Sequence, residues 1–394
     1  MPSRRRYLAA LGTAGSVGGA GCLGTLGVDG NGGDDEATGP ASDDTDWPTV
    51  GRDSRRSSHA PDARVPADPA EAWSVEVSRH VGLAAAGDAV LLASWDGVTA
   101  LDAATGDRLW RAAPADDGTF HTVPTVHDGT VYVGSDRGLV TLDPRTGERR
   151  WAVDLPEGVL VPPAVGYDGE SLLVAGGHTV AEVELADRSV RWTTEVAMPV
   201  SQPLTYFDGS LFVGAEGGEL YGLTPAAEGH LSWRQKLPGR LFGAPAAGPN
   251  DWLYVDTNDG YVHAVSPNRA GGVVWSSAER AASSGTLAVA HTTAYVAGAG
   301  GVMALDAYDG TTRWRAGEGF FCPPVLAGET LCVGDERGGV VAFDASNGTL
   351  AGVGGRQRWR HQHGGRVRRL VAAGGRLFGA TEPAEGEPTL FALE

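Results

Sequence analysis

Histidine and carboxylate side chains that could bind a metal occur in short clusters. His361 and His363 form a His-x-His pair, and alternate residues of a strand point to the same side, so both rings would share one face. The acidic turns 135–138, 257–260 and 334–338 offer carboxylates for calcium. However, Asp and Asn before Gly are ordinary turn formers, and neither zinc-site nor EF-hand spacing is present. We therefore interpret the histidines as a strand end and the carboxylates as turn residues, and expect no metal.

Arginine is concentrated in one short stretch of an acidic chain whose formal net charge is −18. Near His361 and His363 lie six arginines: Arg356, Arg358, Arg360, Arg366, Arg368 and Arg369. Arg366, Arg368 and Arg369 form a candidate site for an anion or for a carboxylate of a partner. The alternative is that these arginines pair with acidic groups on the protein's own surface, where each pair contributes little.

Other chemistry has weaker support in the sequence. Cys322 and Cys332 lie on adjacent predicted strands, but the hairpin register does not place them opposite each other. Two buried thiols are therefore expected, and a disulfide is the alternative. The Gly-rich stretches lack the Gly-Lys-Ser/Thr of a phosphate loop. The acidic charge opposes binding to nucleic acid or to an anionic membrane.

The elements that must position these residues belong to a repeat marked by tryptophan. Eight of the eleven tryptophans lie 37 to 45 residues apart. They are Trp73, Trp110, Trp151, Trp192, Trp233, Trp275, Trp314 and Trp359. An interval of about forty residues is typical of the four-stranded blade of a β-propeller.

One repeat shows why this period folds into a blade. Residues 122–155 contain four runs rich in Val, Tyr, Thr and Leu, bounded by Gly, Asp or Pro, which predicts four strands. Asp143 can accept hydrogen bonds from the turn before the last strand, and Gly147 supplies a left-handed conformation. Trp151 then lies on the outermost strand, where it can pack against the next blade. The same spacing recurs in Asp102/Gly106/Trp110 and in Asp306/Gly310/Trp314.

The two ends of the repeated region predict how the ring closes. Residues 368–394 supply only three strands, and the strand around Trp73 has no three strands before it. Placing this N-terminal strand on the outer edge of the last blade leaves fewer open edges. We expect an all-β, eight-bladed β-propeller with four-stranded blades over residues 70–394. The arginine cluster then reaches the inner strand of the last blade, and inner strands line the channel.

The motif Leu-Asp-x-x-Thr-Gly-x-x-x-Trp in an eight-bladed ring resembles the PQQ-type β-propeller repeat. This resemblance implies a fold and leaves two functions open: quinoprotein dehydrogenases, which bind pyrroloquinoline quinone (PQQ), and non-enzymatic lipoproteins similar to the outer-membrane assembly factor. The enzymes carry adjacent cysteines, a calcium-binding carboxylate set, a base aspartate and long insertions, none of which this sequence matches. We therefore expect no catalytic residue and no cofactor, and a PQQ-dependent quinoprotein dehydrogenase is the alternative.

The first 69 residues resemble an export signal followed by a linker. In residues 1–22, Arg4 and Arg5 belong to a basic cluster that resembles a twin-arginine export signal, and the apolar run after it is too short for a membrane span. Ala-Gly-Cys ending at Cys22 resembles a lipoprotein processing site, with a plain secretory signal as the alternative. Residues 23–46 are predicted to be a disordered acidic tether. Residues 47–69 form a lead-in in which Trp47 is expected to pack on the propeller.

These features together predict an exported, lipid-anchored, non-enzymatic propeller that binds or scaffolds a protein or another envelope component. It would be a monomer on the outer face of the cytoplasmic membrane, held there only by the lipid. The acidic composition, with Lys236 as the single lysine, resembles that of proteins from salt-loving archaea. The chain therefore also resembles an exported haloarchaeal lipoprotein. A sensor or glycan-binding role would need exposed rim aromatics such as Phe320 and Phe321, for which core packing is the other interpretation.

Overall fold

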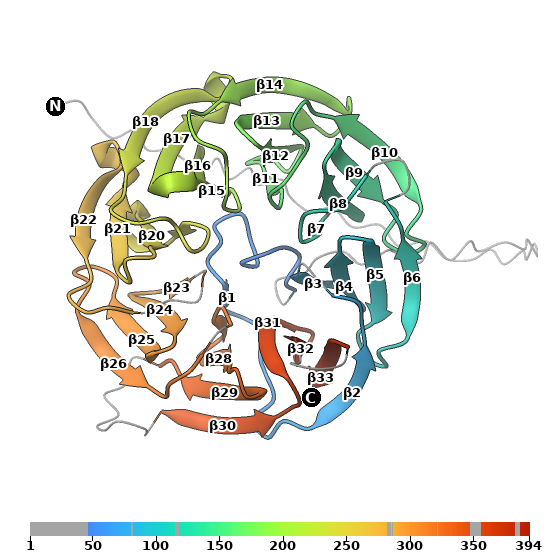
Figure 1. Cartoon of the computed structure of the whole chain (residues 1–394), viewed down its shortest axis with the longest axis vertical. Helices are drawn as coiled ribbons and strands as arrows, with labels where there is room; N and C mark the ends of the chain where they lie inside the picture. The colour runs from blue at the N-terminus through green and yellow to red at the C-terminus, as the bar shows by residue number, and fades with distance from the viewer. Residues whose placement is uncertain are drawn as a thin grey trace, which may run out of the picture. The chain divides into compact units, whose positions relative to one another are not determined.

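Eight blades, each built on four antiparallel strands, follow one another around a ring (Figure 1). This computed structural model describes residues 46–394 except 80–81, 115–117, 282–284, 286, 321, 347–355 and 383–386. The predicted eight-bladed propeller is confirmed. Arg4, Arg5, Cys22 and the predicted tether up to residue 45 lie outside the described residues.

Each blade is built from the centre of the ring outward. Blades 1 and 2 contain β3 (Gly82–Ala86), β4 (Ala89–Ser94), β5 (Gly97–Asp102), β6 (Arg108–Ala112), β7 (Thr125–His127), β8 (Thr130–Ser135), β9 (Gly138–Leu142) and β10 (Arg149–Asp154). Blades 3 and 4 contain β11 (Ala164–Val165), β12 (Ser171–Gly176), β13 (Thr179–Glu184), β14 (Ser189–Glu195), β15 (Thr205–Phe207), β16 (Ser210–Ala215), β17 (Glu219–Thr224) and β18 (His230–Lys236). Blades 5 and 6 contain β19 (Ala246–Ala247), β20 (Leu253–Asp256), β21 (Val262–Ser266), β22 (Gly272–Ser276), β23 (Ala288–Ala290), β24 (Thr293–Gly298), β25 (Gly301–Asp306) and β26 (Thr312–Ala316).

The last two blades complete the ring. They contain β27 (Val325–Ala327), β28 (Thr330–Gly334), β29 (Gly339–Asp344), β30 (Gln357–Gln362), β31 (Arg366–Ala373), β32 (Arg376–Glu382), β33 (Thr389–Leu393) and β2 (Glu71–Glu76), and β1 (His59–Ala60) adds to blade 7. Short 3-10 turns are η2 (Glu216–Gly218), η3 (Pro225–Ala227), η4 (Pro249–Asp251) and η5 (Pro267–Arg269). In the part of the chain that the structure describes, no helix has the length and apolar character needed to cross a membrane.

The middle strands are buried on both faces because each blade is covered by its two neighbours. All six residues of β8 are buried, whereas the outer strand β10 is mostly exposed or half-buried. The apolar clusters accordingly span junctions between blades. One of them joins Val98 and Trp110 of blade 1 to Val131 and Val140 of blade 2. Burial of these side chains is the main source of stability for the ring.

The repeat tryptophans connect neighbouring blades as the sequence predicts. The indole Nε1 of Trp110 donates to the carbonyl oxygen of Pro144 in blade 2 over 2.8 Å. Gly147 lies against the same indole with φ +72°, and a Cβ placed on it would be 2.5 Å from Cε3 of Trp110. The turn therefore needs glycine for its backbone conformation and for this close approach. The indole–carbonyl bond recurs from Trp73 to Ala103 and from Trp275 to Ala307.

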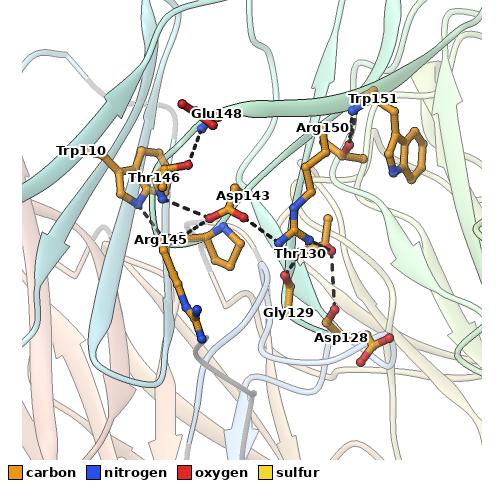
Figure 2. A network of polar contacts seen from close by, with 12 residues as sticks. Trp110, Asp128, Gly129, Thr130, Asp143, Arg145, Thr146, Glu148, Arg150 and Trp151 are labelled. Atoms are coloured by element: carbon orange, nitrogen blue, oxygen red, sulfur yellow. Dashed lines mark hydrogen bonds and ion pairs between the residues drawn. The ribbon is translucent and has the colours of Figure 1, made fainter. Parts of the chain in front are cut away.

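A polar network around Asp143 fixes the turn between β9 and β10 (Figure 2). Oδ1 of Asp143 accepts hydrogen bonds from the backbone N–H groups of Arg145 and Thr146, at 2.8 and 3.1 Å. The Arg150 guanidinium bridges Oδ2 of Asp143, at 2.8 Å, and Oγ1 of Thr130, at 2.7 Å. The same three residue types connect in blades 6 and 7: Asp306, Arg313 and Thr293, and Asp344, Arg358 and Thr330.

The eight indoles are not equally buried. Trp73, Trp110, Trp192 and Trp275 are buried, whereas Trp151, Trp233, Trp314 and Trp359 are only partly buried against the apolar clusters they contact. Blade 3 shows one cause, because its turn places Arg188, with φ +54°, where other turns have glycine. The Arg188 guanidinium carbon lies 5.9 Å from the centre of the Trp151 ring. A long charged side chain thus covers an indole that a tight glycine turn would enclose.

The ring closes as predicted, through β2 on the outer edge of blade 8. β2 pairs antiparallel with β33, and Trp73 lies opposite Ala392. His363 fastens this closure, because Nδ1 lies 2.8 Å from Oε2 of Glu71 and Nε2 lies 3.1 Å from Oγ1 of Thr389. Its ring also stacks on Phe391, with centroids 4.2 Å apart.

The lead-in does more than pack on the propeller, because it fills the channel. We name residues 46–60 the channel segment; Figure 1 shows it in the middle of the ring. Trp47 is 3% exposed and exchanges backbone hydrogen bonds with Ala85 of blade 1, and Ser54 Oγ bonds to Val165 of blade 3. Five other blades donate backbone N–H groups to it: Val126 to Pro48, Tyr206 to Ser54, Ala247 to Arg55, Val289 to Ser57 and Leu326 to Ser58. The segment therefore contacts the inner strands of seven blades.

Arg56 fixes the channel segment at its centre. The residue is 0% exposed. Its Nε donates to the carbonyl oxygen of Leu204 in blade 4 at 2.7 Å, and Nη2 donates to that of Pro163 in blade 3 at 3.0 Å. Nη1 donates to the carbonyl oxygen of Val50 at 2.8 Å within the segment. Burial lowers the pKa of Arg56 to about 10, so the guanidinium stays protonated at neutral pH.

His59 makes the channel segment sensitive to acid. Its Nε2 is buried without a hydrogen-bond partner, and burial, helped by His291 and Arg52, lowers its pKa to about 4. Asp62 opposes this shift only weakly. The folded state therefore binds fewer protons at this group than the unfolded state between pH 4 and 6.5, so stability falls as the pH falls through that range.

We expect acidification from pH 7 to pH 5 to cost the native protein about 2 kcal/mol through His59 alone. Urea unfolding at several pH values measures this term as the difference between the native protein and His59→Gln, in which it should vanish. Equal losses of stability in the two proteins over this range would contradict the assignment.

Candidate functional site

A cavity of about 390 Å³ opens on the ring axis, at the face of the ring where the inner strands begin. Its floor is the channel segment, through Trp47, Val50, Gly51 and Ser58. Its walls come from residues at or just before the inner strands, among them His121, Leu160, Gln202, Phe242 and Arg369. We name this cavity the axial funnel. These five residues come from five different blades, so the ring itself positions the site.

The axial funnel differs in character from the rest of the surface. Leu160 and Phe242 are 40% and 46% exposed, so two large apolar side chains are accessible at the funnel. His121, Ser201 and Gln202 place polar groups between them. No described residue of the lining is Asp or Glu, although the chain has 49 of them. The funnel is therefore a neutral to positive, partly apolar depression in an acidic protein.

Arg369 is the single basic residue of Lys or Arg type among the described lining residues. Its Nη1 donates to the backbone oxygen of Arg368 at 3.0 Å, and no described carboxylate pairs with it. The residue is exposed at its position on β31, so its guanidinium is accessible from the funnel. An anion in the funnel would meet a guanidinium whose hydrogen-bonding capacity is largely unused.

The other two arginines of the predicted anion site lie differently. Nε of Arg368 lies 2.8 Å from Oε2 of Glu382, and this hydrogen bond lowers the pKa of Glu382. Nη2 of Arg366 lies 4.0 Å from Oε2 of Glu336. The structure therefore separates the predicted trio: Arg366 and Arg368 face carboxylates of the chain, and Arg369 lines the funnel.

The rest of the arginine cluster also serves the blade. Arg358 and Arg360 form ion pairs with Asp344 and Asp335. Arg356 donates to the carbonyl oxygens of Asp344 and Ser346, and its guanidinium lies over the Trp314 ring at 5.2 Å. These contacts match the alternative interpretation, in which the arginines pair within the chain.

The carboxylates considered for calcium hold their own turns. Oδ1 of Asp335 accepts the N–H groups of Arg337 and Gly339, at 2.8 and 2.7 Å. Asp259 likewise accepts the N–H group of Tyr261, whereas Asp136 accepts that of Thr119 from the segment before β7. Among the described residues, no three of His, Cys, Asp and Glu gather in a way that could hold a metal.

The residues considered for redox chemistry or for ligand stacking are buried. Cys322 and Cys332 are free thiols, so the disulfide alternative is wrong in this structure. Burial raises the pKa of Cys322 to about 12 and raises that of Cys332 further, which makes both thiols unreactive. Phe320 is 2% exposed and packs in the core, and Phe321 lies outside the described residues.

The described residues do not fit the quinone site that the enzyme branch of the resemblance implies. The funnel lining has one guanidinium and no carboxylate for calcium, and its floor is the channel segment. Neither free cysteine is adjacent to another cysteine in the chain. We therefore derive no step through the quinone.

Comparison with known proteins links this geometry to a family. A family model described as "Outer membrane protein assembly factor BamB" matches residues 62–202 and 176–394. The assembly factor BamB of Bordetella pertussis is 23% identical over 305 residues, covering 71% of this chain and 77% of that protein. The serine/threonine-protein kinase AfsK of Streptomyces griseus is 34% identical over 125 residues, which cover 30% of this chain and only 15% of the kinase.

Two solved structures share the fold at low sequence identity. BamB from Moraxella catarrhalis aligns with a TM-score of 0.64 and 19% identity, over 83% of this chain and 97% of that one. Quinohemoprotein alcohol dehydrogenase from Comamonas testosteroni aligns with a TM-score of 0.69 and 14% identity, over 89% of this chain and 80% of that one. The propeller fold is thus common to an outer membrane protein assembly factor and an alcohol dehydrogenase.

Proposed function

Because the chain belongs to the family of the outer membrane protein assembly factor BamB, we propose that it is a non-enzymatic binding propeller of the cell envelope. It holds a partner protein or another envelope component at the axial funnel. Export through the Arg4-Arg5 signal and a lipid on Cys22 would place it on the outer face of the cytoplasmic membrane. It works as a monomer, without a cofactor.

The observation that carries this proposal is the closed channel. The channel segment bonds to the inner strands of seven blades and forms the funnel floor. Apolar side chains, a few neutral polar groups and one guanidinium line the space above this floor, and among the described residues no group of His, Cys, Asp and Glu that could hold a metal is found. Such a surface can hold a ligand that is partly apolar and carries a polar or anionic group.

The first described residue of the channel segment contacts the end of the ring opposite the funnel. Oδ2 of Asp46 accepts the N–H of Gly87, in the turn that follows β3. This turn lies at the opposite end of the inner strands from the funnel.

Site-specific photocrosslinking on intact cells tests the proposal. A photoreactive residue at Leu160 or at Phe242 should capture the same envelope component from both positions. A matched probe at Tyr308, which is 48% exposed in the turn between β25 and β26 on the far face, should not. Absence of a common adduct from the two funnel positions would contradict a funnel-bound partner.

A cofactor assay separates binding from catalysis. Purified protein mixed with PQQ and then dialysed should show no quinone absorbance. Stoichiometric retention of the quinone would instead support the dehydrogenase alternative.

A further inference from the structure

We propose that the axial funnel receives the free carboxyl-terminal end of a polypeptide, with the terminal carboxylate on Arg369 and an apolar side chain against Leu160 and Phe242. This inference rests on the proposed function and names the chemistry of the partner segment.

The charge distribution selects an anion. The chain carries a formal net charge of −18, yet the described lining of the funnel has no carboxylate. Arg369 supplies the guanidinium, and Arg79 and Arg368 lie with it around an adjoining cavity of about 250 Å³ that Glu382 also lines. Glu382 is engaged by Arg368, so it leaves Arg369 without a carboxylate partner among the described residues. A carboxylate binds a guanidinium with two parallel hydrogen bonds of defined geometry.

The walls select an apolar neighbour for that anion. Leu160 and Phe242 stand on blades 3 and 5 and expose a large part of their side chains to the funnel. Pro162, Pro203 and Pro323 add apolar surface without N–H groups that would need a partner. A ligand with a carboxylate and an adjoining apolar group would cover these surfaces and displace water from them.

The size and polarity of the funnel favour a chain end over a whole domain or a lipid tail. A volume of about 390 Å³ lies near the lower limit for ligand pockets, so it can hold only a few residues. Gln202 donates its amide nitrogen to the carbonyl oxygen of Leu241 at 3.2 Å, and its amide oxygen bonds to no other described group. With His121 and Ser201 it offers hydrogen-bonding groups that a peptide backbone can use and an alkyl chain cannot.

Calorimetric titration of the purified full chain tests the inference with three probes. These are N-acetyl-leucyl-phenylalanine as the free acid, its carboxamide, and octanoate. The free acid should bind at least about tenfold more tightly than the carboxamide, because the charged hydrogen bonds depend on the carboxylate. Arg369→Gln should abolish this difference. The matched control Arg376→Gln, whose arginine pairs with Glu394 on the far face of the same blade, should preserve it.

A second variant covers the case in which Arg369→Gln perturbs the blade. Phe242→Ser should weaken the free acid and the carboxamide by the same factor, since it alters only the apolar wall. Equal affinity for acid and amide in the native protein would overturn the inference, as would octanoate binding without peptide binding.

The two proposals fail in different ways. Cellular adducts at Leu160 and Phe242 combined with no carboxylate preference would refute the inference and leave the proposed function standing. Retained PQQ, or no cellular adduct from either position, would refute the proposed function, whereas a preference for the free acid that Arg369→Gln removes would still support the inference.

Discussion

Replacement of Trp192 by alanine is expected to lower the free energy of unfolding by about 3–5 kcal/mol, the usual cost of deleting a buried aromatic side chain. Trp192 is 7% exposed and belongs to the apolar cluster that joins blades 3 and 4. Gly229 of blade 4 lies against it so closely that a Cβ there would be 2.4 Å from Cζ3 of the indole. The truncation therefore leaves a cavity that neither blade can easily fill.

The surroundings of Trp192 add a polar cost. Its Nε1 donates to Glu182, whose residue is only 6% exposed and which also accepts from Arg191 at 3.1 Å. Loss of the indole removes a donor from a buried carboxylate, which is unfavourable in addition to the cavity. Trp151→Ala should cost less, because that indole is only half-buried.

Chemical denaturation followed by far-UV circular dichroism measures these differences. Trp95→Ala is the matched control, because Trp95 is 70% exposed outside the repeat and its loss should change stability by no more than about 0.5 kcal/mol. A loss below about 1 kcal/mol for Trp192→Ala would mean that the indoles do not hold the blades together.

The fold was readable from the sequence because one local rule is repeated eight times. A tryptophan on the outer strand contacts the turn of the next blade, so its spacing reports the blade period even where turns such as that of Arg188 have lost their glycine. The missing strands at the two ends then left one way to close the ring, through β2 and β33. The blade count depends on contacts between blades that are neighbours in the sequence, and the closure depends on contacts between the first and last strands of the ring.

Glu182 shows what the repeat alone does not reveal. In the seven other blades, the residue paired with the tryptophan is small: Ala100, Thr141, Gly222, Ala264, Ala304, Ala342 or Ala392. Blade 3 places a carboxylate there and satisfies it with the indole and Arg191. Comparing the repeats with one another would have marked this position, because a buried charge must have partners.

The candidate site was only partly predictable. The sequence marked Arg366, Arg368 and Arg369. Strand alternation alone does not determine which of them lines the funnel and which of them pair with carboxylates of the chain. The pairing of β31 with β32 shifts register between Val367 and Arg369, as at a β-bulge. Such an irregularity changes the direction of the side chains that follow it. The arginine that lines the funnel could therefore not be identified from the spacing of the residues.

The channel segment could not be derived, because it has neither a period nor a repeat. Its partners are spread over seven blades, so each contact joins residues distant in sequence. Arg55 and Arg56 are adjacent and identical in type, yet Arg55 is exposed over the Phe207 ring and Arg56 is 0% exposed. Only the surrounding ring distinguishes the two.

Arg56→Met is expected to destabilise the protein by about 3–5 kcal/mol, because it removes the guanidinium donors from a set of buried carbonyl oxygens. Methionine fills most of the space of the arginine stem, so the loss is mainly polar. The oxygens of Leu204, Pro163 and Val50 would lose their guanidinium partner. Arg56→Lys should recover only part of the stability, since an ammonium has three donors on one atom and cannot span both blades.

The neighbouring arginine supplies the control for this prediction. Arg55→Met alters a side chain of the same type in the same segment, but it removes only a cation–π contact with Phe207 at 4.4 Å. Its cost should stay within about 1 kcal/mol. Comparable losses for the two variants would show that the buried guanidinium has no special role.

Hydrogen exchange distinguishes release of the channel segment from general weakening of the ring. The N–H groups of Tyr206, Ala247 and Val289 donate to the segment, whereas that of Trp151 donates to Thr141 within blade 2. If Arg56 holds the segment in place, Arg56→Met should accelerate exchange at the first three amides more than at Trp151. Equal acceleration at all four would mean that the ring loosens as one unit and that the segment is held mainly by its backbone bonds.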